Sequence, residues 1–183
     1  MNNKKLNEFL KKADDNGLWA FSTFSFYTAF PEEDRRSIII SLRRHVEAGN
    51  LLRVSKGVYV NSSARSMPEF PLAHLLHLLK PHSLFYLSLE SVLSEEGLIS
   101  QIPNRLTLIT NGRSQTFNTS LGIVEFVHST KNAELFLKNT KFDKFKGIHV
   151  ASVKLAKADM KRTRRSLDLL EETERKMEGI WHL

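Results

Sequence analysis

Three closely spaced histidines are the side chains best placed for metal chemistry in this sequence. His74 and His77 stand three residues apart, as two ligands on one helix face would, and His82 follows them. A zinc site needs further nitrogen, sulfur or carboxylate ligands. The chain has no cysteine, and Glu69 is the one carboxylate near these histidines. We therefore interpret them as helix-surface or rim residues and expect no metal site.

The sequence also lacks the residue patterns that covalent or acid–base catalysis requires. Ser88 lacks the flanking glycines that hold a nucleophilic serine on a strained turn. The eight glycines of the chain do not have the spacing of a phosphate-binding loop. Acids near the C-terminus alternate with lysine and arginine, which predicts ion pairs along a solvated helix face. These acids are Asp159, Asp168, Glu171 and Glu172. We expect no catalytic residue, no cofactor and no enzymatic activity.

Basic side chains on one helix and on the hairpin after it are instead suited to nucleic acid. Residues 32–60 predict an amphipathic helix followed by strands at 51–55 and 58–61, with Lys56 and Gly57 in the turn. A basic helix that runs into a basic hairpin is the pattern of a recognition helix and wing in a winged helix-turn-helix. The expected DNA-binding residues are Ser37, Ser41 and Arg44 at base edges, Arg36 and Arg43 at phosphates, and Arg53 and Lys56 in the wing.

Charge supports this interpretation without proving it. The net charge is +7 and the isoelectric point about 9.7, which favours an acidic partner. The excess is denser in residues 1–66, where eleven basic and seven acidic residues leave +4. However, Glu32, Glu33 and Asp34 stand where a recognition helix usually meets DNA, and they would repel phosphate. We therefore expect contacts further along the helix. The alternative is an ordinary amphipathic helix packed on a hairpin, with solvated arginines.

The elements that must position these residues form a first domain over 1–66. We expect a helix that ends near Gly17, a short strand over 18–21, a second helix capped by Ser22 or Thr23, and a third that begins at Pro31. The expected core residues of the third helix and hairpin are Leu42, Val46, Val54, Val58 and Tyr59.

A second domain of mixed type is expected over 67–183, after a polar linker at 61–68, and the fold class is therefore α+β. Helices are predicted over 72–80, 87–96, 133–138 and 155–177, and strands over 105–110, 115–119, 122–128 and 148–153.

A group of basic residues on the last of these helices has two interpretations. It is a second nucleic-acid contact or a docking strip for an acidic partner, or it is the solvated face of a helix whose inner face is apolar. The residues of this basic ridge are Lys161, Arg162, Arg164 and Arg165.

No apolar run approaches the roughly 20 residues that span a bilayer. The basic N-terminal segment has no apolar stretch of the kind that signal peptides carry. The absence of cysteine suits a reducing compartment. We expect a cytoplasmic protein without a membrane partner.

Four blocks of the sequence resemble AbiEi-type antitoxins, the antitoxin half of the abortive-infection AbiE systems. Residues 86–103 resemble the block Y-x-S-x-E-S-A-L-x-x-x-G of that family, and residues 110–128 continue the likeness. Residues 150–159 resemble the block A-S-P-E-x-A-x-x-D, with Val153 and Lys154 where proline and an acid are usual. Leu51 to Tyr59 is similar to the end of the family's winged helix.

The resemblance implies an N-terminal winged helix that represses its own operon and a C-terminal antitoxin domain. The implied partners are double-stranded DNA of the protein's own promoter and a nucleotidyltransferase-like toxin, which the antitoxin counteracts without necessarily forming a stable complex. Two alternatives stay open. One is a winged-helix transcription regulator controlled by a ligand or by oligomerisation, without antitoxin activity, and the other is a protein-docking module.

Overall fold

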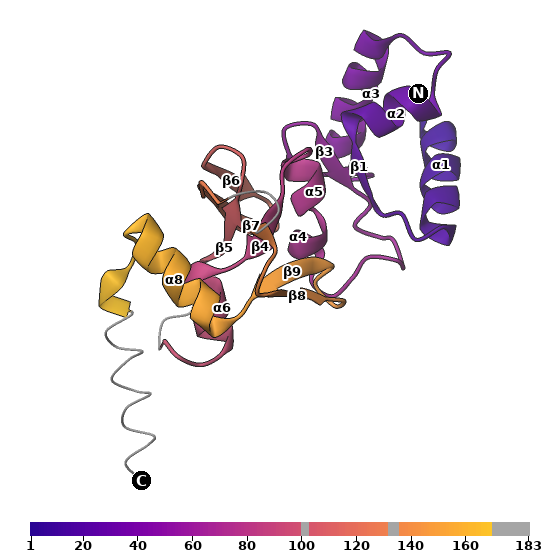
Figure 1. Ribbon diagram of the computed structural model, residues 1–183. Coiled ribbons are helices and arrows are strands. Elements are labelled where there is room, and N and C mark those ends of the chain that lie inside the picture. Colours follow the sequence, from indigo (N-terminus) through magenta and orange to yellow (C-terminus); the bar gives the residue numbers. More distant parts are fainter. Residues whose placement is uncertain (100–102, 132–135, 170–183) are drawn as a thin grey trace. The chain divides into compact units, whose positions relative to one another are not determined.

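The computed structural model describes residues 1–99, 103–131 and 136–169, and it is a mixed α+β structure (Figure 1). The chain divides into two compact units. The first holds residues 1–81 with 119–121, and the second holds 82–118 and the described residues from 122 on. Residues 67–81, which the sequence analysis assigned to the second domain, thus group with the first unit. Among the described helices, none has the length and apolar character needed to cross a bilayer.

The first unit combines helices with a small antiparallel sheet whose strand order is β1-β3-β2. Its elements are α1 (Asn3–Asp15), β1 (Ala20–Ser22), α2 (Thr23–Ala29), α3 (Arg35–Glu47), β2 (Leu52–Ser55) and β3 (Val58–Val60), followed by the short helices α4 (Pro71–His74) and α5 (Leu76–Leu79). The predicted hairpin is confirmed, and the helix predicted over 72–80 is divided between α4 and α5.

Side-chain caps fix where the helices of this unit begin. Ser22 caps α2 through a capping box with Ser25, as predicted for one of two candidate residues. The carboxylate of Asp34 caps α3 by accepting hydrogen bonds from two backbone amides of the first turn. The prediction that this helix begins at Pro31 is therefore wrong, because the chain turns into the helix only after Asp34.

An aromatic cluster holds the first unit together. Phe9, Phe21, Phe26, Phe30 and Tyr59 contact one another with ring centroids 5.2 to 5.8 Å apart. Such pairs stabilise a core beyond the area that they bury. The core predicted for the third helix and hairpin is confirmed: Leu42, Val54, Val58 and Tyr59 are buried, and Val46 packs against the core while partly exposed.

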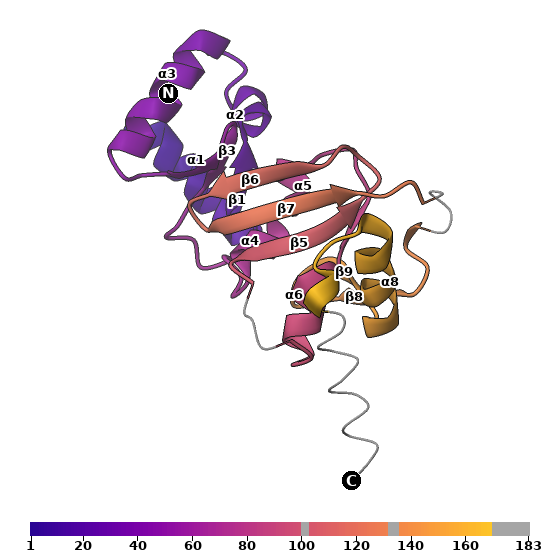
Figure 2. The same cartoon turned by 90° about the vertical axis from the view of Figure 1, so that its left-hand side faces the viewer.

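The second unit is built on a six-stranded mixed sheet with the order β6-β7-β5-β4-β9-β8. Its strands are β4 (Phe85–Leu87), β5 (Arg105–Thr110), β6 (Gln115–Thr119), β7 (Gly122–His128), β8 (Thr140–Asp143) and β9 (Ile148–Ala151). β5 runs parallel to β7 and β4 parallel to β9, whereas β4 is antiparallel to β5 and β8 to β9. Figure 2 shows the arrow of β6 opposed to that of β7. The strands predicted over 105–128 are confirmed at their bounds.

Two helices of this unit, α6 (Leu89–Glu95) and α8 (Val153–Thr163), pack against each other. α8 is shorter than the helix predicted over 155–177. It ends at Thr163, because Arg164 and Ser166 adopt positive φ angles of 52° and 46°. The part of that prediction beyond residue 169, and residues 133–135 of the helix predicted over 133–138, lie outside the described residues.

Candidate nucleic-acid interface

The outward face of α3 carries most of the basic residues predicted to bind DNA. Arg36, Ser37, Arg43 and Arg44 are all exposed. Arg36 and Arg43 are seven residues apart, as are Ser37 and Arg44, which places the two pairs on neighbouring ridges of one helix face. Ile40 lies among them and is 59% exposed. Ile39 is also exposed, at 44%, so the surface has three guanidinium groups around two apolar side chains.

The acids before α3 are engaged by partners within the first unit. Asp34 caps the helix, Glu32 accepts from the ammonium of Lys5 at 3.3 Å, and Glu33 pairs with the N-terminal amine of Met1. Each carboxylate that would repel phosphate is therefore compensated by a cation or by backbone N–H groups. The charge at this end of α3 opposes an anionic ligand less than the sequence alone indicates.

Ser41 does not lie on the outward face. It is 2% exposed and accepts a hydrogen bond from a guanidinium nitrogen of Arg44 at 3.2 Å. Its position follows from helix geometry, because Ile38, Leu42 and His45 are its neighbours on the buried face. A buried hydroxyl in this place does not reach a base edge, so this part of the site prediction is corrected.

The hairpin between β2 and β3 presents the remaining predicted basic residues. Arg53 and Lys56 are exposed, and Gly57 turns the chain with φ at 77°. The backbone carbonyl of Gly57 accepts a hydrogen bond from the amide of Thr23 at 2.8 Å. The tip of the hairpin is therefore tied to the beginning of α2.

The basic ridge in the second unit is not continuous. Arg162 donates to Asp159 at 3.1 Å, and Arg165, beyond the end of α8, forms ion pairs with Glu90 and Glu125 at 2.6 and 2.7 Å. Lys161 and Arg164 are the other two members of the ridge, and both are exposed. Arg165 thus joins elements of the second unit, whereas the second interpretation of the ridge placed it on a solvated helix face.

A buried aspartate joins distant parts of the second unit. Asp159 is fully buried and accepts hydrogen bonds from the hydroxyls of Tyr86 and Ser88 at 2.8 and 2.9 Å. Its second oxygen accepts from the ammonium of Lys131 at 2.9 Å and from Arg162. Burial, and then the charge of Asp159, raise the pKa of Tyr86 above its usual range, so this phenol stays a proton donor.

A second cluster centres on Arg165. Its guanidinium donates to one oxygen of Glu90 and to both oxygens of Glu125, and Arg105 donates to Glu125 at 3.0 Å. Hydrogen bonding by Arg165, above the opposing effect of burial, lowers the pKa of Glu125. The cluster ties α6 to β7 and to the chain after α8.

Sequence reasoning missed both clusters, because it placed Asp159 and Arg165 on a solvated helix face. One signal was available: Ala156 and Met160, which flank Asp159 on the same side of α8, are apolar and fully buried. Among residues 1–99, 103–131 and 136–169, no group of three or more His, Asp or Glu side chains is arranged to hold a metal ion.

The clusters collect side chains from separate blocks of the sequence. Tyr86 and Ser88 come from one block named in the sequence analysis, Asp159 from another, and Glu125 from a third. In comparisons with known proteins, no family model matches this chain, and no curated protein matches it.

Proposed function

We propose that this protein is a DNA-binding antitoxin of the AbiEi type, which represses its own operon and counteracts a nucleotidyltransferase-like toxin. The first unit acts as a winged helix-turn-helix in this proposal. α3 enters a major groove of operator DNA, and the hairpin of β2 and β3 is the wing that contacts the flanking backbone.

The observation that carries the DNA-binding part is the exposed basic face of α3 next to an exposed basic hairpin. The element order helix, strand, helix, helix and hairpin supports it, because this order provides a recognition helix directly before a wing. The compensated acids at Glu32 to Asp34 remove the strongest argument against it.

The antitoxin part is supported by the resemblance of the four sequence blocks. The side chains that represent these blocks in the second unit pack into two polar clusters, and Glu90, Arg105 and Arg165 of the second cluster also line a pocket of about 260 Å³. The role of the clusters in the proposal is to hold the antitoxin domain in shape. No residue of the chain has a catalytic role in this proposal.

A mobility-shift titration on DNA from immediately upstream of the gene tests the first part. Arg44→Ala should weaken operator binding by about 1–3 kcal/mol, because it removes one base-reading arginine. Lys56→Ala should weaken binding to all sequences and lower the salt slope by about one unit, because it removes one phosphate contact. Lys11→Ala, at an exposed site on α1, is the matched control. Operator binding by both test variants at wild-type affinity across the salt range would refute this interface.

Growth rescue tests the second part. The chain should restore growth when it is expressed with the nucleotidyltransferase-like gene beside it, and Arg44→Ala should still rescue when both genes are driven from a foreign promoter. Repression of the operon without any rescue of growth would refute the antitoxin function and would support a winged-helix transcription regulator.

A further inference from the structure

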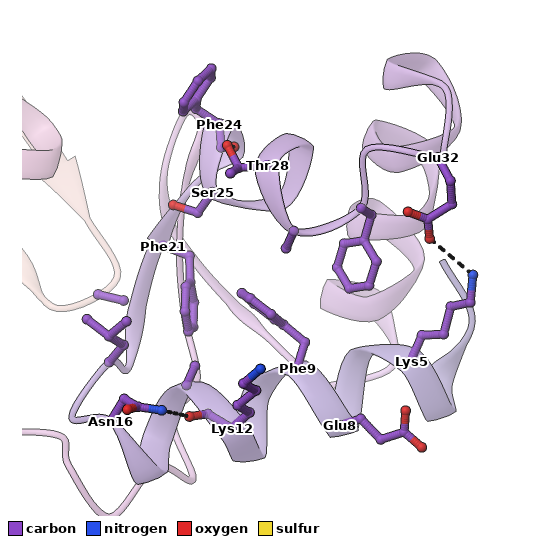
Figure 3. A pocket seen from close by; sticks show the side chains of 15 residues that line it. Lys5, Glu8, Phe9, Lys12, Asn16, Phe21, Phe24, Ser25, Thr28 and Glu32 are labelled. Carbon is purple, nitrogen blue, oxygen red and sulfur yellow. Dashed lines mark hydrogen bonds and ion pairs between the residues drawn. The ribbon is translucent and has the colours of Figure 1, made fainter.

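A wide groove on the first unit is not used by the proposed DNA-binding face. It has a volume of about 930 Å³ and lies between α1, β1 and α2. This volume is within the range of roughly 300–1,000 Å³ that is typical of small-molecule sites. Figure 3 shows the groove, with Phe9 and Phe21 on its floor and Phe24 at its edge.

Aromatic rings dominate the lining. Phe9 contacts Phe21 and Phe30 with ring centroids 5.2 and 5.6 Å apart, so the floor is a fixed aromatic surface. Phe24 and Leu18 extend the apolar surface toward solvent and are 69% and 57% exposed. Such a lining suits a flat, apolar ligand, which gains both buried area and edge-to-face ring contacts.

One cation gives the groove a polar preference. Lys12 and Glu8 both line the groove from α1, and the carboxylate of Glu8 is directed away from Lys12 in Figure 3. Lys5, at the other end, is already paired with Glu32. Among the residues that the structure describes, no carboxylate pairs with Lys12. The groove therefore offers an aromatic floor and one ammonium group, that of Lys12, without a carboxylate partner in the described part of the chain.

We propose that this groove binds a small molecule with an aromatic body and a single anionic group, held by ring contacts and by the ammonium of Lys12. Phe30 and Glu32 line the groove and connect α2 to α3. A bound ligand would therefore hold the segment that leads into α3 in place, and with it the orientation of the outward face of α3. This regulatory consequence rests on the proposed function, whereas the binding itself does not.

The first probe is 8-anilinonaphthalene-1-sulfonate, and the second is N-phenyl-1-naphthylamine, which has the same rings without the sulfonate. Fluorescence titration of the full chain should give saturable binding of one sulfonate probe per chain. Lys12→Met should raise the Kd of the sulfonate about fivefold, as expected for a partly solvated ion pair, and change that of the uncharged probe less than twofold. Lys11→Met, also exposed on α1, should behave as wild type.

Thr28→Trp tests the location. Thr28 is exposed on α2 and lines the groove, so an indole there fills the site without disturbing the core. Circular dichroism should show an intact fold, and both probes should lose binding at least tenfold. Non-saturable binding, or binding that survives Thr28→Trp, overturns the proposal. A dimer in sedimentation that Thr28→Trp dissociates also overturns it, because the groove would then be covered by a second copy of the chain.

The uncharged and sulfonated probes are then added to the mobility-shift assay. A change in operator affinity with the sulfonate, lost in Lys12→Met, supports the regulatory consequence. If the chain binds no operator DNA, the proposed function fails while the fluorescence titration still decides the binding site.

Discussion

Replacing Asp159 by asparagine should destabilise the second unit strongly, because the substitution removes a buried charge while keeping its size. The carboxylate accepts four hydrogen bonds, two from hydroxyls and two from cations. Asparagine retains one acceptor oxygen for the hydroxyls and turns an N–H₂ group toward the cations. The side chain of Arg162 is 42% exposed and can rotate into water, but that of Lys131 is only 15% exposed.

The expected loss follows from this difference between the two cations. Breaking a buried ion pair from one side costs about 3–5 kcal/mol, and Lys131 is the partner that is left buried. We therefore expect a loss of about 3–5 kcal/mol in the free energy of unfolding, against the roughly 5–15 kcal/mol of a typical domain. Tyr86→Phe, which removes one of the hydroxyls, should cost about 1–2 kcal/mol.

Urea unfolding followed by circular dichroism measures the loss, and hydrogen exchange with mass spectrometry locates it. Amides of β4 and α8 should lose protection, whereas those of α1 and α3 should keep it. Asp168→Asn, an exposed site beyond α8, is the control and should change stability by less than about 0.5 kcal/mol. A loss below 1 kcal/mol for Asp159→Asn would show that the buried charge is not engaged as the distances indicate.

Three further perturbations report on other parts of the chain. Burial lowers the pKa of His45, so the unfolded chain binds a proton more readily than the folded chain does. The free energy of unfolding of the first unit should therefore fall as the pH drops through 6.5. His45→Gln should flatten that dependence in urea titrations at several pH values. Gly57→Ala should lower stability by about 1–2 kcal/mol in thermal unfolding, because φ is 77° and the new methyl group would lie 3.3 Å from the hydroxyl of Thr23. Gly49→Ala has a similar φ but no atom within 4 Å, so it should cost less, and an equal loss would argue against the contact. Arg165→Met leaves Glu90 and Glu125 without their shared cation, although Glu125 keeps its pair with Arg105, and should cost about 3–5 kcal/mol in the same urea assay, with wild-type stability as the contrary result.

The parts of the fold that the sequence predicts are those set by local chemistry. The turn at Lys56 and Gly57 and the strands on either side follow from alternation and one glycine. The strands β5, β6 and β7 follow in the same way. The core positions of α3 follow from a period of 3.6 residues. Ser41 shows the limit of this reasoning, because a small hydroxyl on the buried face of a helix is tolerated once Arg44 satisfies it.

The parts that escape prediction depend on partners far away in the chain. Asp159 is buried because hydroxyls 71 and 73 residues away surround it. The helix predicted to continue past Thr163 breaks where Arg165 reaches Glu90, 75 residues away. A periodic pattern contains no information about such pairs. Ion pairs between remote elements can therefore offset the strain of two residues with positive φ.

The hydrogen bond between the backbones of Thr23 and Gly57 orders the hairpin tip, which affects how strongly the tip can bind an anionic partner. An untethered loop loses backbone freedom at about 1–2 kcal/mol per residue when a ligand orders it. Here the amide of Thr23 already holds the carbonyl of Gly57 at 2.8 Å, so the backbone beside Lys56 is ordered before a partner arrives. A contact through Lys56 then loses only the freedom of one side chain, and such preorganisation leaves more of the interaction free energy as affinity.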